Sequence, residues 1–276
     1  MQRNPAVSDS FYTGNGKRLE RQVRDFLSKA YVSMELVKGA VSYVAPHAGY
    51  RYSGGVAAFT YKALGMKKGL DGVDSFVIVG PNHTGLGHPI SISAADWKTP
   101  LGTVKNDIEL SKEIAERSAM ITIDEEAHRM EHSVEVQLPF LQEVVSKPRC
   151  CFICMGDQSL DHCRALYYAI SESANRLGRR IVVIASSDFN HYESASIAKK
   201  KDMPALKELE SLRFEQFHRK IEESGDSACG YGPITVSAMF AKGSGASRGL
   251  MLRYSNSGDV TGDYDSVVAY SSMAFM

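Results

Sequence analysis

The chain has 276 residues, of which 43% are hydrophobic and 23% are charged. This composition is typical of a globular protein without a long disordered tail, and a single α/β domain of this length can bury a large core. The 32 basic residues balance the 32 acidic ones, so no net charge would draw the protein to nucleic acid or to an anionic membrane. We therefore expect a small-molecule or peptide ligand.

The N-terminal sequence and the cysteine content favour the cytoplasm. Residues 1–22 contain no apolar core segment, and no run approaches the about 18 apolar residues of a membrane span. Five cysteines, an odd number, do not make a disulfide framework in a chain of this length. We expect a cytoplasmic protein whose cysteines pack in the core, bind a metal or act as reactive thiols.

Short apolar runs alternate with stretches of helical periodicity, which predicts an α/β fold. In chain order we predict a helix at 17–29, a strand at 40–45, a helix at 54–64, a strand at 75–79, helices at 107–118 and 133–145, a strand at 150–155, a helix at 161–177, a strand at 181–185, helices at 204–223 and 232–241, and strands at 250–254 and 266–275. The last two strands are too close for a crossover helix, so an antiparallel pair and a mixed sheet are expected. Helices would cover both faces, and no linker or repeat divides residues 1–276 into two domains.

Polar and ionisable residues begin directly after three of the predicted strands. His47 follows the first of them, His83 follows the second, and Asp188 and His191 follow the strand at 181–185. In open α/β sheets, ligands bind beyond the carboxyl ends of the strands, so these three loops would meet. Imidazoles converge on few things besides a metal or a proton-transfer site. A surface or hydrogen-bonded role is the alternative for each histidine taken alone.

Cys229 lies in a Gly-rich turn before an apolar helix that has Pro233 near its first turn. A thiol beside a helix N-terminus feels the positive end of the helix dipole, which lowers its pKa and favours the thiolate. Cys229 is therefore a candidate metal ligand or nucleophile. The alternative is a small residue fitted where the chain turns tightly.

The segment from His128 to His132 fits the H-x-x-E-H pattern of inverted zinc metallopeptidases. On a helix the two histidines would share a face, and Glu131 could act as a base. The match covers five residues, and no third ligand on a second helix stands out. The preferred interpretation places Glu131 and His132 at a helix start, pointing into the same cleft as the other candidates.

Two other patterns are weaker than they look. Cys151 and Cys154 resemble a C-x-x-C zinc pair, but in a strand residues three apart point to opposite faces. We therefore expect buried, packed thiols, and the cysteines concerned are Cys150, Cys151, Cys154 and Cys163. The Gly-rich segments 80–87 and 243–249 fit neither a Walker A nor a dinucleotide fingerprint, so no nucleotide cofactor is expected.

Six motifs together resemble the Memo family, named for a mediator of receptor-driven cell motility. In chain order they are APHAGYRYSGGVAA, VGPNHTGLG, WKTPLG, EHSVEVQLPFL, SSDFNHY and CGYGPI. Their order and spacing match that family over essentially the whole chain. The family is similar in fold to the class III extradiol dioxygenases, non-haem Fe(II) enzymes that open catechol-type rings with two histidines and a glutamate as metal ligands.

The resemblance implies one transition-metal ion held by His47, His83 and Cys229. The similarity to the dioxygenases favours Fe(II) as the metal. Cys229 stands where the dioxygenase pattern has its carboxylate, however, and the softer thiolate shifts the preference toward copper or zinc, which puts ring-opening activity in doubt. His191 would take the role of the dioxygenases' acid/base histidine. The residues that would line the same cavity and form the predicted catalytic set are Asp188, His191, Glu131 and His132.

Three functions stay open at this point. The first is a metal-dependent redox enzyme, dioxygenase-like, that acts on an unknown small molecule. The second is a non-enzymatic module that captures a phosphopeptide or another anion in the same cleft. The third is the metallopeptidase. The family association in bacteria and archaea also implies radical-SAM and AMMECR-type protein partners.

Overall fold

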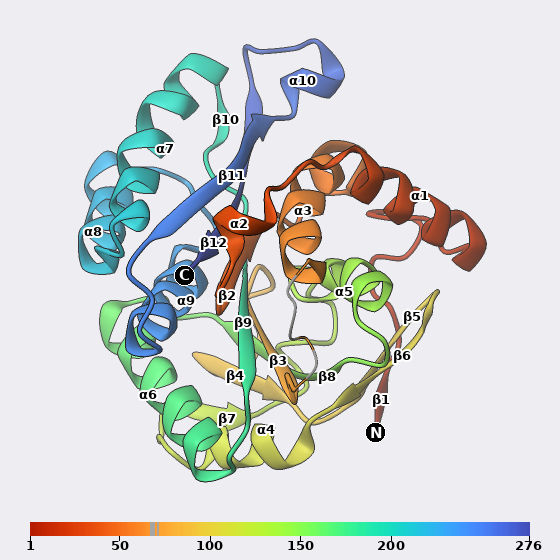
Figure 1. Ribbon diagram of the computed structural model, residues 1–276, viewed down its shortest axis with the longest axis vertical. Helices are drawn as coiled ribbons and strands as arrows, with labels where there is room; N and C mark the ends of the chain where they lie inside the picture. The colour runs from red at the N-terminus through yellow and green to blue at the C-terminus, as the bar shows by residue number, and fades with distance from the viewer. Residues whose placement is uncertain (67–69, 71) are drawn as a thin grey trace.

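The computed structural model describes residues 1–66, 70 and 72–276, and a mixed sheet crosses its centre (Figure 1). The strands of the main sheet are β1 (Gln2–Arg3), β2 (Ser42–Ala45), β3 (Ser75–Pro81), β5 (Asp96–Thr99), β6 (Gly102–Asn106), β8 (Arg149–Met155), β9 (Ile181–Ser186), β10 (His191–Glu193) and β12 (Val267–Phe275). They lie in the order β1–β5–β6–β8–β3–β9–β2–β12–β10. β11 (Gly249–Asn256) pairs with β12, β4 (Ile90–Ser93) pairs with β8, and β7 (Ile121–Ile123) pairs with β4.

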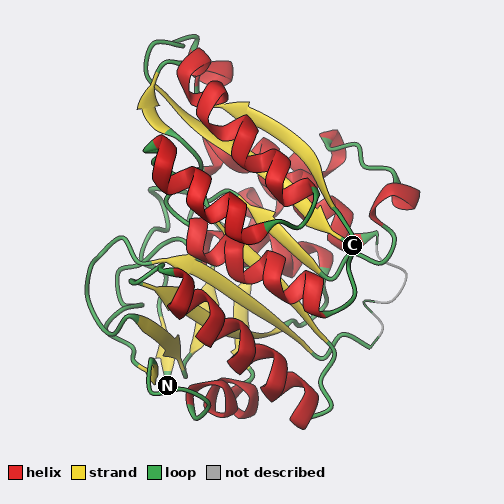
Figure 2. Cartoon of the chain, turned by 90° about the vertical axis from the view of Figure 1, so that its left-hand side faces the viewer, coloured by secondary structure: helices red, strands yellow, loops and turns green. Residues whose placement is uncertain are grey.

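Helices cover both faces of this sheet (Figure 2). They are α1 (Gly16–Lys29), α2 (Met34–Val37), α3 (Tyr50–Gly65), α4 (Ile108–Ala115), α5 (Leu138–Val144), α6 (Leu160–Arg176), α7 (Ala195–Glu210), α8 (Phe214–Ser224), α9 (Tyr231–Gly243) and α10 (Gly258–Thr261), with a 3₁₀ turn, η1, at Glu135–Gln137. Helices α1, α3 and α5 pack together on one face, and α4, α6 and α9 form the layer on the other. No helix of the described residues is long and apolar enough to cross a membrane.

The central strands β8, β3, β9 and β2 are parallel and buried on both faces. Alternate residues of β3 belong to different layers: Phe76 and Ile78 pack toward α1, α3 and α5, whereas Val77 and Val79 pack toward α4, α6 and α9. This double burial explains why these strands read as continuous apolar runs. The predicted α/β fold with a mixed sheet is confirmed.

The C-terminal strands bear out the predicted antiparallel pair. β11 and β12 pair in antiparallel register from Gly249 opposite Phe275 to Asn256 opposite Ala269, and β12 is also antiparallel to β2. The hairpin and the short helix α10 extend beyond the rest of the sheet (Figure 1).

The predicted helix at 204–223 is wrong, because two helices occupy this stretch. α7 ends at Glu210, α8 begins at Phe214, and Leu212 between them has a positive φ of 50° that ends the first helix. Leu212 is buried in the same apolar cluster as both helices, so the apolar pattern continues across the turn. Pro204 lies inside α7 and not at a helix start.

The carboxyl ends of three parallel strands lie at the same level. In the registers of β9 with β2 and β3, Ala45 is opposite Ser186 and Val79 is opposite Ala185. The residues that directly follow β2, β3 and β9 must therefore lie side by side. This edge of the sheet carries the candidate site.

Candidate metal centre

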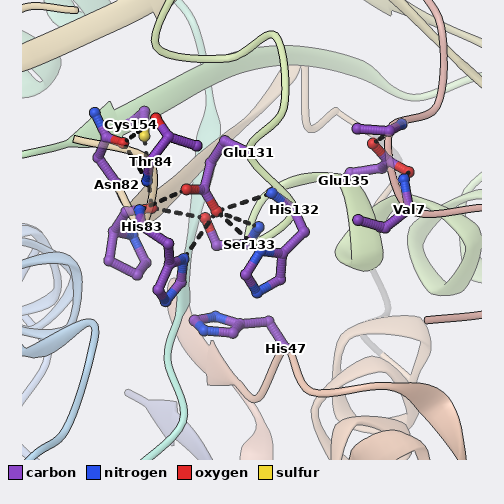
Figure 3. A network of polar contacts seen from close by, with 12 residues as sticks. Val7, His47, Asn82, His83, Thr84, Glu131, His132, Ser133, Glu135 and Cys154 are labelled. Carbon is purple, nitrogen blue, oxygen red and sulfur yellow. Dashed lines mark hydrogen bonds and ion pairs between the residues drawn. The ribbon is translucent and has the colours of Figure 1, made fainter. Parts of the chain in front are cut away.

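The structure brings His47, His83 and Cys229 together at this edge. One donor atom from each side chain, two imidazole nitrogens and a sulfur, all lie within 4.8 Å of one another. Cys229 Sγ is 3.1 Å from His47 Nε2, and the rings of His47 and His83 meet edge to face with centroids 5.1 Å apart. Figure 3 shows the His47 ring pointing between those of His83 and His132.

A buried carboxylate, that of Glu131, holds His83. Its oxygens accept hydrogen bonds from His83 N at 2.6 Å and from His83 Nδ1 at 3.0 Å (Figure 3). Burial alone would raise the pKa of Glu131, but the hydrogen bond and charge of His83 and the N–H group of Ser133 hold it at about 2. An ionised carboxylate only accepts hydrogen bonds, so His83 Nδ1 carries a proton, and the neutral form of the ring has its lone pair at Nε2. That is the tautomer a metal ligand needs.

His132 completes a second donor group with His83 and Glu131, whose ligand atoms also lie within 4.8 Å of one another. Its ring stacks on that of His83 with centroids 4.5 Å apart and contacts Phe11 at 4.6 Å. Burial lowers the pKa of His132 to about 4, so the ring is neutral near pH 7. The structure therefore places Glu131 and His132 next to His83, in the loop before η1.

Asp188 is hydrogen-bonded to the loop that carries His47. Its Oδ1 accepts hydrogen bonds from His47 N at 2.8 Å and from Ala48 N at 3.3 Å, and burial raises its pKa to about 7. The carboxyl group thus holds the backbone of the His47 loop. Asp188 therefore positions His47, whereas the sequence pattern predicted only that Asp188 lines the cavity.

His191 lies near these residues but outside both donor groups that the described residues form. Its Nδ1 is 3.0 Å from Ser227 O, and a carbonyl oxygen can only accept, so Nε2 is left without a proton. Burial lowers the pKa of His191, and the nearby His83 lowers it further. The side chain is suited to take up a proton from a ligand, but no contact with the three candidate ligands places it in their group.

The predicted low pKa of Cys229 is wrong. Burial raises the pKa of the thiol, and the neighbouring Asp188 raises it further, so desolvation outweighs the dipole of α9. The thiol is protonated near pH 7, and its S–H group faces His47 Nε2. A glycine next to it is required by packing, because a Cβ at Gly230 would collide with the carbonyl oxygen of Ser186 at the end of β9.

The helix that the metallopeptidase hypothesis requires at the H-x-x-E-H segment is absent. Residues 124–134 form turns and loop, and the first helical turn after them is η1. His128 is fully buried, its Nε2 lies 3.1 Å from Ser91 O, and burial lowers its pKa to about 4. The two histidines of the pattern do not share a helix face, so this segment lacks the geometry that the metallopeptidase hypothesis needs.

The four remaining cysteines are free and buried, as predicted. Cys150, Cys151 and Cys154 lie in β8, and Cys151 packs in the layer opposite to that of Cys150. Several buried residues that hold the histidines in place were not among the predicted site residues. They are Ser133, Gln137 and Ser186, and the first two lie within the motif EHSVEVQLPFL, where polar residues recur among apolar ones.

Comparison with known proteins gives one consistent result. The family model described as Memo-like protein matches residues 3–274. A MEMO1 family protein of Methanosarcina mazei is 39% identical over 272 residues, which cover 98% of each chain. Similar proteins of the same description occur in Methanocaldococcus jannaschii, 39% identical over 98% of this chain and 97% of the relative, and in Nitrosopumilus maritimus, 37% identical over the whole of both chains.

Proposed function

The chain belongs to the Memo-like protein family, and on that premise we propose that it binds one transition-metal ion through His47, His83 and Cys229. The observation that carries the proposal is the grouping of two imidazole nitrogens and one sulfur within 4.8 Å of one another. Nitrogen and sulfur donors are typical of transition-metal sites, and three protein ligands leave a position for another ligand.

The charges around the site favour a cation over an anion. Glu131 is ionised, and burial keeps the pKa of His47 and of His132 below the ordinary value, so both rings are neutral near pH 7. A phosphopeptide or a carboxylate would meet neutral imidazoles beside a buried negative charge. The anion-binding alternative therefore has less support than metal binding.

The protein itself supplies ligands that are already held in place. Glu131 fixes the ring and backbone of His83, and Asp188 fixes the backbone at His47. Pre-oriented ligands raise metal affinity because little order has to be created on binding. When bound, the ion would supply Lewis-acid or redox chemistry at this position.

We further propose a redox reaction of a small molecule as the activity of the site, with His191 as its acid/base residue. The free Nε2 of His191 supports this role. Fe(II) is the first metal to test, because the dioxygenase-like fold implied by the sequence motifs uses it. Copper and zinc suit the thiolate that Cys229 would become on releasing its proton when the ion binds. The radical-SAM and AMMECR-type partners stay a prediction.

Metal titration of protein purified without oxygen tests the ligand set. We expect wild type to bind close to one equivalent of Fe(II), Cu(I) or Zn(II), and its Co(II) form to show thiolate-to-metal charge-transfer absorption. Cys229→Ala should abolish that absorption. It should also weaken metal binding by at least about 10- to 100-fold, the loss typical when a residue that only hydrogen-bonds to a metal ligand is replaced. Cys151→Ala is the matched control, because Cys151 is buried in the core layer formed with α4, α6 and α9.

Each outcome of the titration has a clear meaning. Unchanged metal content in Cys229→Ala would show that the ligand assignment is wrong. Absence of metal from wild type after reconstitution would overturn the metal proposal, and binding of a phosphotyrosine peptide by the same protein would then favour the anion-binding function.

The substitution Glu131→Gln is expected to lower metal affinity by about 10- to 100-fold while the protein stays folded. The four groups that the carboxylate faces, two on His83 and the N–H groups of His132 and Ser133, are all hydrogen-bond donors. An amide would turn an N–H group toward one of them, so His83 loses its orientation. Titration with Zn(II) measures the change, and equal affinity in variant and wild type would show that Glu131 does not support the ligand.

A further inference from the structure

A chain of buried hydrogen bonds leads to Nδ1 of the His47 ring, the nitrogen that does not face Cys229. The Tyr61 hydroxyl is 2.9 Å from Gln137 Oε1, and Gln137 Nε2 is 2.7 Å from Ser186 Oγ. Ser186 Oγ is 2.9 Å from His47 Nδ1. Tyr61, Gln137 and Ser186 are at most 1% exposed, so water does not compete for these groups.

The contacts of Gln137 permit one orientation of its amide. One amide atom lies 3.0 Å from the carbonyl oxygen of Pro46, which can only accept a hydrogen bond, so this atom is the NH₂ group. Its second hydrogen then points to Ser186 Oγ, and Oε1 accepts from the Tyr61 hydroxyl. Ser186 is therefore an acceptor toward Gln137.

The contacts of Ser186 in turn decide which nitrogen of His47 carries the proton. The hydroxyl group has one hydrogen, and the carbonyl oxygen of Ser133, 2.6 Å away, requires it. One lone pair of Ser186 Oγ accepts from Gln137, so His47 Nδ1 must donate to the other. The lone pair of His47 is then at Nε2, which faces Cys229 Sγ at 3.1 Å.

We propose that Gln137 and Ser186 are positioning residues that hold His47 in the tautomer protonated at Nδ1, with Nε2 directed into the site. Gln137 acts on the residue twice, because it holds both the Pro46 carbonyl before His47 and the Ser186 hydroxyl beside its ring. The tautomer is a property of the protein without metal. Only the effect on metal affinity rests on the proposed function.

Ser133 connects this support with that of the other histidine. Its carbonyl oxygen takes the Ser186 hydrogen bond, and its N–H group donates to Glu131 Oε1 at 2.8 Å. Glu131 in turn holds His83. One residue thus links the supports of both candidate imidazole ligands, which explains how two loops far apart in sequence keep a common geometry.

Long-range ¹H–¹⁵N NMR of protein labelled at histidine nitrogens tests the inference directly, with chelator present and no metal added. A His47→Gln variant identifies the signals. We expect wild type to show His47 protonated at Nδ1 near neutral pH. In Ser186→Ala, Nδ1–H loses its acceptor, so the form protonated at Nε2 should gain a clear population. Ser42→Ala is the matched control, because Ser42 is also fully buried and donates one hydrogen bond, to Ser237 O.

Zn(II) titration of the same variants adds the functional readout. We expect Ser186→Ala to weaken Zn(II) binding by about 10- to 100-fold and Ser42→Ala to leave it unchanged. A wild-type His47 protonated at Nε2 overturns the proposal even if no variant folds, and so does an unchanged tautomer in Ser186→Ala. If wild type binds no Zn(II) while its tautomer is the expected one, the metal proposal fails and the positioning role stands.

Discussion

Glu135→Ala is expected to destabilise the protein by about 3 to 5 kcal/mol, because it breaks a buried ion pair from one side. The Glu135 carboxylate, which is fully buried, lies 2.7 Å from Arg3 Nη1. It also accepts hydrogen bonds from Ala6 N at 2.7 Å, Val7 N at 3.1 Å and the Tyr12 hydroxyl at 2.6 Å. Truncation would leave a buried guanidinium and three donors without their acceptor.

The effect should extend from the N-terminal segment to the candidate site. Arg3 also donates to the carbonyl oxygens of His128 and Glu131, and Phe11 packs on the His132 ring. Release of this segment would therefore loosen the loop that carries Glu131. We expect Zn(II) affinity to fall together with stability.

Urea unfolding measures the change in free energy, and Glu143→Ala provides the control. Glu143 pairs with the mostly exposed Arg24, and such surface pairs contribute about 0 to 1 kcal/mol. A loss below about 1 kcal/mol in Glu135→Ala would contradict a structural role for the buried pair. The double variant that also replaces Arg3 by Met should recover part of the loss, because it removes the unpaired charge.

The order of apolar runs predicted the central sheet and the edge that holds the site. His47 and His83 could be placed together because each follows a strand at that edge, whereas Cys229 joined them only through the resemblance to the Memo family. Side-chain environment was not predictable in the same way. The pKa of Cys229 depends on burial and on Asp188, and Asp188 lies in the loop after β9, about 40 residues earlier in the chain. A motif shows which residues follow one another, but burial depends on segments far away in sequence.

A helix at the H-x-x-E-H segment and a single helix at 204–223 are both absent from the structure, for a related reason. Five residues with helical spacing do not form a helix when Glu131 instead accepts hydrogen bonds from the N–H groups of its neighbours His132 and Ser133. Leu212 has the apolar character that a helix position requires, and only its backbone conformation shows that α7 has ended. Gln137 and Ser186 lie within two of the motifs, but their role depends on the direction of hydrogen bonds, which the sequence does not show.

We expect the protein to lose stability as pH rises, and Asp202→Asn should remove a large part of this loss. Asp202 of α7 is fully buried, and it faces Asp226, which precedes the Cys229 turn. Its oxygens accept from the Tyr254 hydroxyl at 2.6 Å and from Asn190 N at 3.3 Å. Burial raises the pKa of Asp202 well above its ordinary value, and Asp226 raises it further. The folded protein therefore binds a proton here that the unfolded chain releases near pH 4.

The direction in which the free energy of unfolding changes with pH follows from that difference in bound protons. Above about pH 4 the folded state holds more protons than the unfolded state, so the free energy of unfolding falls with rising pH, by up to about 1.4 kcal/mol per unit, until Asp202 is ionised in both states. An asparagine cannot ionise, and its NH₂ group can donate to Asp226. Urea unfolding from about pH 5 to about pH 9 should give a smaller slope for Asp202→Asn than for wild type. The surface variant Asp25→Asn, whose side chain is 54% exposed, should keep the wild-type slope, whereas equal slopes in Asp202→Asn and wild type would show that Asp202 is ionised in the folded protein throughout this range.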